Sequence, residues 1–127
     1  MRFLIEPLLS AAQCRAMAEQ LQGAGDAWRP GTDTAGWHAR RAKTNHQLDR
    51  QCPLHQALAA ELQDQLRRHP LIQAAAFPRQ IHSFLFSRSG VGEGYGRHVD
   101  NAWMAGGRSD LSFTIALVDP DCYQGGA

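Results

Sequence analysis

The sequence lacks any apolar run long enough to form a membrane-spanning helix. Such a helix needs about 20 consecutive, mostly apolar residues, and every apolar stretch of this chain is much shorter. The first residues combine a basic side chain with a short apolar run, as a secretion signal does, but Glu6 and Pro7 interrupt that run. These absences predict a cytoplasmic protein with no membrane partner.

Cysteine is also scarce, and its spacing forms no framework. The three cysteines, Cys14, Cys52 and Cys122, are odd in number, far apart and without a C-x-x-C pair. A disulfide scaffold or a structural zinc site requires paired cysteines at closer spacing. We therefore expect three free thiols, as in a reducing compartment.

Neither sign of charge is in excess. Lys and Arg number 13 against 12 Asp and Glu, which gives a formal net charge of +1. This balance produces no field that would attract nucleic acid, so we expect no nucleic-acid partner.

The sequence does contain enough apolar residues for a core, 43% of 127 residues. A chain of this size and composition can bury one core, which predicts one domain.

Helical periodicity characterises residues 1–77. Ser10 opens a pattern whose apolar side chains share one face, and Gly23 ends it. Pro53 is well placed as the first residue of a second helix, which ends before Pro70 because proline disfavours a helical residue in front of it. The apolar stripe of the second helix repeats every four residues through Leu54, Leu58, Leu62 and Leu66. A short piece over 71–77 is expected to add one or two helical turns.

Strand patterns are short before residue 78 and dominate residues 78–127. Residues 79–88 alternate apolar and polar side chains, and residues 95–100 and 111–118 predict two further strands. Shorter strand signals occur at residues 2–6, near Trp28 and within 37–49. Because the helices come first and no βαβ alternation follows, the sequence predicts an α+β fold built on antiparallel sheet.

One pair of possible metal ligands lies in the predicted strand 95–100. His98 and Asp100 are separated by one residue, and side chains alternate along a strand, so both should project from the same face. An imidazole and a carboxylate are two of the three ligands in the facial triad of non-haem iron(II) oxygenases, which leaves positions open for co-substrate and oxygen. An H-x-D pattern alone is common by chance, so the residues around it decide whether it indicates a metal site.

Those surroundings resemble a known family. Tyr95-Gly96-Arg97-His98-Val99-Asp100 follows a glycine-rich turn, and the segment 111–118 runs into Asp119-Pro120-Asp121-Cys122-Tyr123-Gln124-Gly125-Gly126. Upstream, residues 43–49 read K-T-N-H-Q-L-D and residues 86–88 read F-S-R. With these motifs the sequence resembles the iron(II)- and 2-oxoglutarate-dependent dioxygenases of the prolyl hydroxylase type, and in particular the bacterial PKHD-type hydroxylases.

The resemblance implies a fold, cofactors and site residues. The fold it implies is a double-stranded β-helix, or jelly roll, whose first strands are residues 78–127, with the helices of residues 1–77 packed on them. His98 and Asp100 are then catalytic iron ligands. Tyr95 is a candidate to hydrogen-bond the co-substrate 2-oxoglutarate, and the alternative is that it fills the core beside the metal strand. L-ascorbate is a further candidate cofactor. The implied activity is hydroxylation of a small-molecule or peptide substrate that the sequence does not identify.

The sequence departs from the family at two places. In the family the second histidine ligand and the basic residue for 2-oxoglutarate lie several strands further on, whereas this sequence ends at Ala127, so the C-terminal strands are missing. None of the other histidines stands in a motif position, and each is expected at the surface or in a loop: His38, His46, His55, His69 and His82. Ser89 stands where the family usually carries a tyrosine that lines the co-substrate pocket.

Two consequences follow for the chain as given. Half of a jelly roll leaves sheet edges open, which predicts self-association through those edges. The alternative function is a catalytically silent metal-binding or interaction module, since two ligands hold iron less firmly than three.

Trp103 and Met104 are candidates for substrate contact or for covering the core. Lys43, Asn45 and Gln47 are interpreted as a solvated strand face, with a role near the mouth of the site as the alternative.

Overall fold

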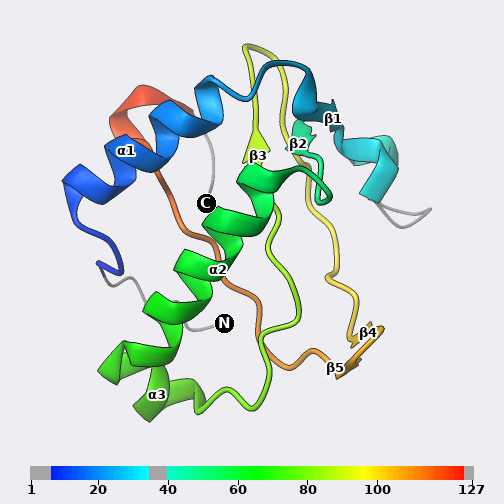
Figure 1. Ribbon diagram of the computed structural model, residues 1–127. Helices are drawn as coiled ribbons and strands as arrows, with labels where there is room; N and C mark the ends of the chain where they lie inside the picture. The colour runs from blue at the N-terminus through cyan, green and yellow to red at the C-terminus, as the bar shows by residue number, and fades with distance from the viewer. Residues whose placement is uncertain (1–6, 35–39, 125–127) are drawn as a thin grey trace.

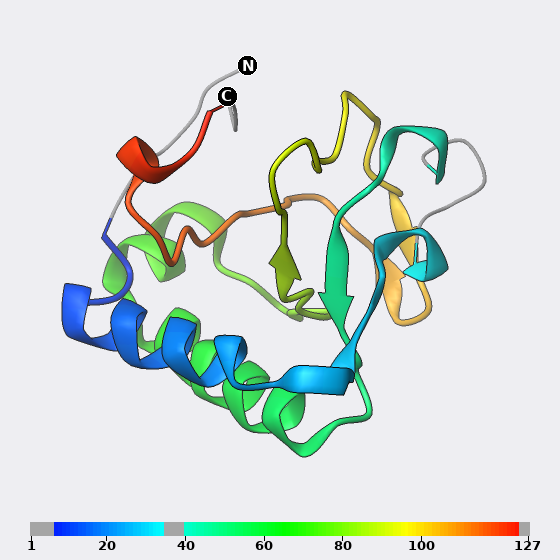
Figure 2. The same ribbon diagram turned by 90° about the horizontal axis from the view of Figure 1, so that it is seen from above.

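The structure is a computed structural model that describes residues 7–34 and 40–124. Its helices are α1 (Ala11–Gln22), α2 (Pro53–Arg68) and α3 (Pro70–Ala76), and its strands are β1 (Trp28–Pro30), β2 (His46–Leu48), β3 (Ser87–Arg88), β4 (Trp103–Met104) and β5 (Gly107–Arg108). Four short 3-10 helices cover Gly25–Ala27, Gly31–Thr34, Arg40–Ala42 and Pro120–Cys122. In both views α1 and α2 lie side by side. The strands lie to one side of them, and the extended segment after β5 passes behind the two helices in Figure 1 (Figures 1 and 2).

The first predicted helix is confirmed, and its start has a local cause. Ser10 and Gln13 form a capping box in which the Ser10 hydroxyl accepts from the Gln13 amide at 3.2 Å and the Ser10 amide donates to the Gln13 side chain at 2.8 Å. This exchange satisfies two amides that the first turn leaves without intrahelical partners. Gly23 follows the last helical residue, as the sequence predicts.

The second predicted helix is confirmed as well. Pro53 is its first residue, and the Cys52 sulfur caps it by accepting from the His55 amide at 3.4 Å. Pro70 stops this helix and starts α3, which ends at Phe77 in a left-handed conformation with φ of 40°. The predicted stripe faces the core, since Leu58, Leu62 and Leu66 are buried.

The core lies between the two long helices and the extended segments. Its buried apolar residues are Met17, Leu21, Trp28, Leu48, Leu58, Leu62, Leu66, Phe84 and Phe86. Trp28 keeps its one polar group satisfied by donating from Nε1 to the Leu21 carbonyl at 3.2 Å. The Arg88 guanidinium covers the same indole at 4.5 Å from the ring centroid, so charged side chains close the core at this end.

His55 corrects one expectation, because it is buried rather than at the surface, with 7% of its area exposed. It shares the inward face of α2 with Leu58 and Leu62. Its Nε2 is 3.2 Å from the Phe84 carbonyl, and its ring meets Phe86 edge-on at 5.1 Å. A hydrogen bond to the Phe84 backbone carbonyl satisfies one nitrogen of the buried imidazole, and this explains its position without a ligand role.

The described sheets are small and antiparallel, which confirms the α+β class. β1 pairs with β2, with Trp28 opposite Leu48, and β2 pairs with β3, with Gln47 opposite Ser87. β4 and β5 form a separate hairpin that lies away from α1 in both views (Figures 1 and 2). The strand near Trp28 is thus confirmed, and the weak pattern in residues 37–49 corresponds to three strand residues.

The longer strand predictions are wrong for the structure as it stands. Of residues 79–88 only Ser87–Arg88 is strand, residues 95–100 contribute a single bridge from Tyr95 to Lys43, and residues 111–118 form no ladder. A strand exists only where a neighbour accepts and donates its hydrogen bonds. Residues 111–118 have no such neighbour among the described residues, although Ile115 and Leu117 still pack against the core. The predicted strand 2–6 lies outside the described residues.

Two smaller expectations can also be compared with the structure. Cys14, Cys52 and Cys122 are free, as predicted. Within residues 7–34 and 40–124, no helix has the length and apolar character needed to cross a membrane.

We predict that Leu58→Ala lowers the free energy of unfolding of this chain by about 3 kcal/mol, because Leu58 is 2% exposed and its removal leaves a cavity. Urea denaturation followed by circular dichroism measures the effect. Glu61→Ala on the exposed face of the same helix is the matched control and should change stability by less than about 0.5 kcal/mol. Equal midpoints for the two variants would contradict the position of the core.

Candidate functional site

The segment that carries His98 is held by pairing with residues 42–48. β3 pairs with β2 at one end, and beyond it the Thr44 amide donates to the Gly94 carbonyl at 2.9 Å. The Gly94 amide donates to the Thr44 hydroxyl at 3.0 Å, and the Gly96 amide donates to the Ala42 carbonyl at 2.7 Å. These bonds attach the chain on both sides of Tyr95 and so set the position from which His98 starts.

The turn between β3 and Tyr95 is organised around Glu93. Its carboxylate accepts from the Gly90 amide at 2.9 Å and lies 3.3 Å from the Nδ1 of His46 on β2. The Gly90 amide, followed by the His46 hydrogen bond, lowers the pKa of the Glu93 carboxyl. Gly92 supplies the positive φ, 77°, that this turn requires. The glycine-rich turn is therefore a defined connection that brings the His98 segment back beside residues 42–46.

His98 and Asp100 are brought together, as the one-residue spacing predicts. The His98 Nε2 lies 3.2 Å from an Asp100 carboxylate oxygen, and its Nδ1 lies 2.8 Å from the Gly96 carbonyl. Their proximity does not come from a strand, because residues 96–100 are irregular. A local contact from His98 back to Gly96 orients the imidazole instead.

Both ring nitrogens of His98 face oxygen atoms, and this limits what can lie between His98 and Asp100. A neutral imidazole has one N–H and can donate to only one of the two oxygens. With Nδ1 donating to Gly96, the Nε2 lone pair points at a carboxylate, which is repulsive unless a positive charge lies between them. A proton or a metal ion can supply that charge.

Tyr95 lies directly on the imidazole. The two rings are stacked, with centroids 3.7 Å apart and planes 13° from parallel. Burial, and then the negative charge of Asp100, raises the pKa of the Tyr95 phenol. The phenol therefore remains protonated over the physiological range and is a hydrogen-bond donor beside His98 and Asp100.

Lys43, Asn45 and Gln47 contradict the interpretation as a solvated face. Their exposed fractions are 3%, 7% and 3%. The alternation along this strand is real, but its polar members point inward, where Gln47 donates to the Ser87 hydroxyl at 3.3 Å and Asn45 lies against Gly31. The Asn45 side-chain oxygen has no hydrogen-bond partner within residues 7–34 and 40–124. Sequence reasoning missed these residues because polarity normally marks the outer face.

The remaining candidates lie apart from this pair. Trp103 is in the β4–β5 hairpin and mostly exposed, and Met104 beside it is half-buried. His69 caps α3 by accepting from Ile72, and His82 lies 3.1 Å from the Arg108 carbonyl. His38 lies outside the described residues. In the part of the chain that the structure describes, no group of three or more His, Cys, Asp or Glu residues could hold a metal.

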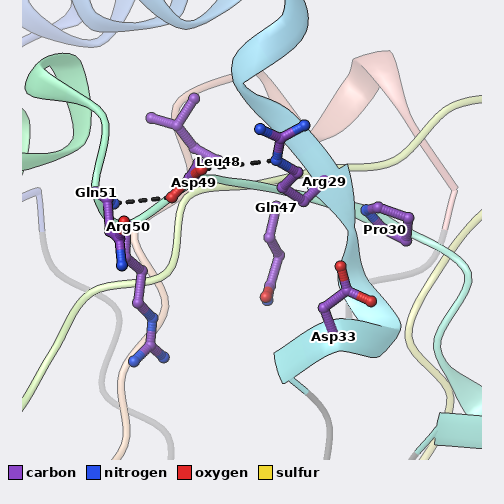
Figure 3. Close-up of a pocket in the computed structure, with 8 residues that line it drawn as sticks. All are labelled: Arg29, Pro30, Asp33, Gln47, Leu48, Asp49, Arg50 and Gln51. Atoms are coloured by element: carbon purple, nitrogen blue, oxygen red, sulfur yellow. Dashed lines mark hydrogen bonds and ion pairs between the residues drawn. The ribbon is translucent and has the colours of Figure 1, made fainter.

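A pocket that the sequence did not predict lies beside β1 and β2. It measures 310 Å³, which is at the lower end for ligand sites, and Figure 3 shows its lining. The lining residues are Arg29, Pro30, Asp33, Gln47, Leu48, Asp49, Arg50 and Gln51. Asp49 pairs with Arg29 at 3.6 Å and accepts from the Gln51 amide at 2.9 Å. Neither His98 nor Asp100 lines this pocket, so it is not the candidate metal site.

Comparison with known proteins shows which class of protein this chain is similar to. A PKHD-type hydroxylase of Prochlorococcus marinus strain MIT 9313 is 45% identical over 98% of this chain, and one of Synechococcus elongatus is 48% identical over 97%. A third, from Prochlorococcus marinus strain AS9601, is 41% identical over 99%. No family model and no solved structure matches the chain. The similarity thus lies with hydroxylases, a class of oxidoreductases.

Within that class, the relatives that match nearly the whole of this chain are PKHD-type hydroxylases, which the sequence motifs also resemble. The chain spans about half the length of the curated relatives it matches, 56% in the Prochlorococcus marinus MIT 9313 and Synechococcus elongatus proteins. This share agrees with the expectation that the chain corresponds to one half of the family's sequence.

We predict that Thr44→Val destabilises this chain by about 1 kcal/mol, because valine keeps the shape but loses the hydroxyl that accepts from the Gly94 amide. Hydrogen exchange should show faster exchange of the Gly94 and Gly96 amides than in the wild type. Thr44→Ser retains the hydroxyl and is the matched control. If valine and serine leave these amides equally protected, the pairing does not hold the His98 segment.

Proposed function

We propose that this chain is the part of an iron(II)- and 2-oxoglutarate-dependent dioxygenase that provides two iron ligands, His98 and Asp100. The observation that carries the proposal is the arrangement of His98, whose Nε2 faces the Asp100 carboxylate at 3.2 Å while its Nδ1 is engaged by Gly96. Two ligands about 2.1 Å from one metal ion and at right angles to each other are about 3.0 Å apart. The observed separation therefore fits a shared metal.

The donor set fits iron(II) in chemistry as well as in spacing. One imidazole and one carboxylate belong to the facial triad, and a metal-bound histidine normally donates its other N–H to a carbonyl or a carboxylate. The Gly96 carbonyl has that position for His98. The third ligand is expected in the half of the relatives that this chain does not span.

The residues around the pair have separate tasks in this proposal. Iron with 2-oxoglutarate and oxygen supplies the oxidation that hydroxylates a C–H bond, and L-ascorbate is a candidate reductant. Tyr95 keeps a protonated hydroxyl beside the pair, and we assign it to hydrogen bonding with 2-oxoglutarate. The exposed Trp103 lies on β4, three residues after Asp100, and is available to a small-molecule or peptide substrate.

The jelly roll belongs to the same proposal. Residues 79–86 and 111–118 are extended but without a ladder among the described residues, and Phe84 already meets Phe113 edge-on at 5.9 Å. Additional strands of the full-length family would give these segments hydrogen-bonding neighbours and cover Leu111, Phe113 and Val118, which are exposed. In this chain alone, the same edges are available for self-association.

We predict that His98→Ala and Asp100→Ala each abolish iron-dependent turnover of 2-oxoglutarate in a version of the protein extended to the length of the relatives. Each change removes one metal ligand, and turnover is measured as release of carbon dioxide from labelled 2-oxoglutarate. Arg97→Ala is the control, because Arg97 is exposed and next to His98 in sequence but is not proposed as a ligand. Full activity in either ligand variant rules out the metal assignment.

We predict that this chain by itself binds iron(II) more than about 100-fold more weakly than the extended protein, since loss of an outer-shell partner alone costs 10- to 100-fold in affinity. Anaerobic titration of both proteins measures the difference. Equal affinity and equal 2-oxoglutarate turnover would show that the third ligand is not in the missing half. Weak binding without turnover in both proteins would favour the catalytically silent module.

A further inference from the structure

Lys43 is a buried lysine beside the candidate iron site. It is 3% exposed, which is rare for this residue type. Its ammonium nitrogen lies 4.8 Å from the centroid of the Tyr95 ring, within the range of a cation–π interaction. Burial is costly for a charge unless other groups stabilise it. The face of Tyr95 provides part of that stabilisation.

The contact between Lys43 and Tyr95 is fixed by the backbone. The two residues are opposite each other in an antiparallel bridge, and hydrogen bonds from Thr44 to Gly94 and from Gly96 to Ala42 flank it. Directly opposed residues in an antiparallel pair have neighbouring side chains. The lysine thus meets the tyrosine through register and not through a chance approach of two long side chains.

Tyr95 in turn contacts the metal ligand. Its ring is stacked on the His98 imidazole at 3.7 Å, so the contacts run in series from Lys43 to Tyr95 to His98. The second restraint on His98 is the Gly96 carbonyl, which engages one nitrogen but leaves the ring free to tilt about that bond. A stacked aromatic ring restricts that tilt.

We propose that Lys43 is a positioning residue of the candidate iron site, which holds the Tyr95 ring on His98 and thereby orients the imidazole. The part of this inference that concerns metal affinity rests on the proposed function, whereas the orientation of His98 does not. Outer-shell groups that fix a histidine ligand typically contribute 10- to 100-fold to metal affinity. Lys43 acts one contact further out, so the effect should lie near the lower limit.

The first test measures the stack in this chain without metal. The ring current of Tyr95 shifts the carbon-bound protons of the His98 imidazole upfield in proton NMR, and His98→Ala assigns these signals. Lys43→Met keeps the length of the side chain without its charge and should lose much of the shift. Lys43→Arg keeps the charge and should retain it.

The second test measures cobalt(II) binding, by its visible absorption, in the protein extended to the length of the relatives. Lys43→Met should weaken binding about tenfold, and Lys43→Arg should restore it. Gln47→Met is the matched control, because Gln47 has the same burial but is opposite Ser87 in the pairing, whereas Lys43 is opposite Tyr95. It should lower stability without changing cobalt affinity or the His98 shifts.

A double-mutant cycle with Tyr95→Leu shows whether the effect passes through the tyrosine. In the Tyr95→Leu background, Lys43→Met should cause no further loss of cobalt affinity. Tyr95→Leu alone should weaken cobalt binding as much as Lys43→Met does. Because Tyr95 is partly exposed, this variant should fold, and it tests the role of the stacked ring if Lys43→Met does not fold.

Three results overturn the inference: unchanged His98 shifts in Lys43→Met, equal losses in Lys43→Met and Gln47→Met, or wild-type affinity in Tyr95→Leu. If the wild-type extended protein binds no cobalt, the proposed function fails. In that case the NMR measurement alone decides whether Lys43 orients His98.

Discussion

The candidate site depends on the pairing of residues 42–48 with residues 87–96. Thr44 and Gly94 exchange hydrogen bonds although they are 50 positions apart in the sequence, and the ladder between β2 and β3 continues this attachment. Closing a loop of that length has an entropic cost that only several simultaneous bonds offset. Because the attachment lies on both sides of Tyr95, it defines where the aromatic ring, and the imidazole stacked on it, can be.

The site then combines one local and one long-range restraint on His98. The local restraint is the contact from Nδ1 to the Gly96 carbonyl, two residues back. The long-range restraint is the Tyr95 ring, whose own place follows from its bridge to Lys43. A side chain that is held from two directions loses less conformational freedom when it binds a ligand, and a site built in this way is called preorganised.

The extended segments explain why similarity to the PKHD-type hydroxylases is compatible with a small sheet content. Residues 111–118 have the alternating apolar pattern of a strand, and their half-buried members already face the helices. What they lack among the described residues is a hydrogen-bonding neighbour, and the relatives are nearly twice as long as this chain. The alternating pattern of a strand is therefore set by the segment's own sequence, whereas a strand forms only when a second segment pairs with it through hydrogen bonds.

The sequence by itself determined the features that depend on near neighbours: both long helices with their caps and stops, the apolar stripe of α2, and the proximity of His98 to Asp100. It also carried enough motif to indicate the family. Only the tertiary structure decided that Lys43 and Gln47 are buried, that His55 belongs to the core, and that residues 95–100 follow an irregular path. Capping, periodicity and a one-residue spacing act within a few positions of the chain. Burial of a polar side chain and pairing of a strand depend on a partner elsewhere in the fold, which a local pattern cannot specify.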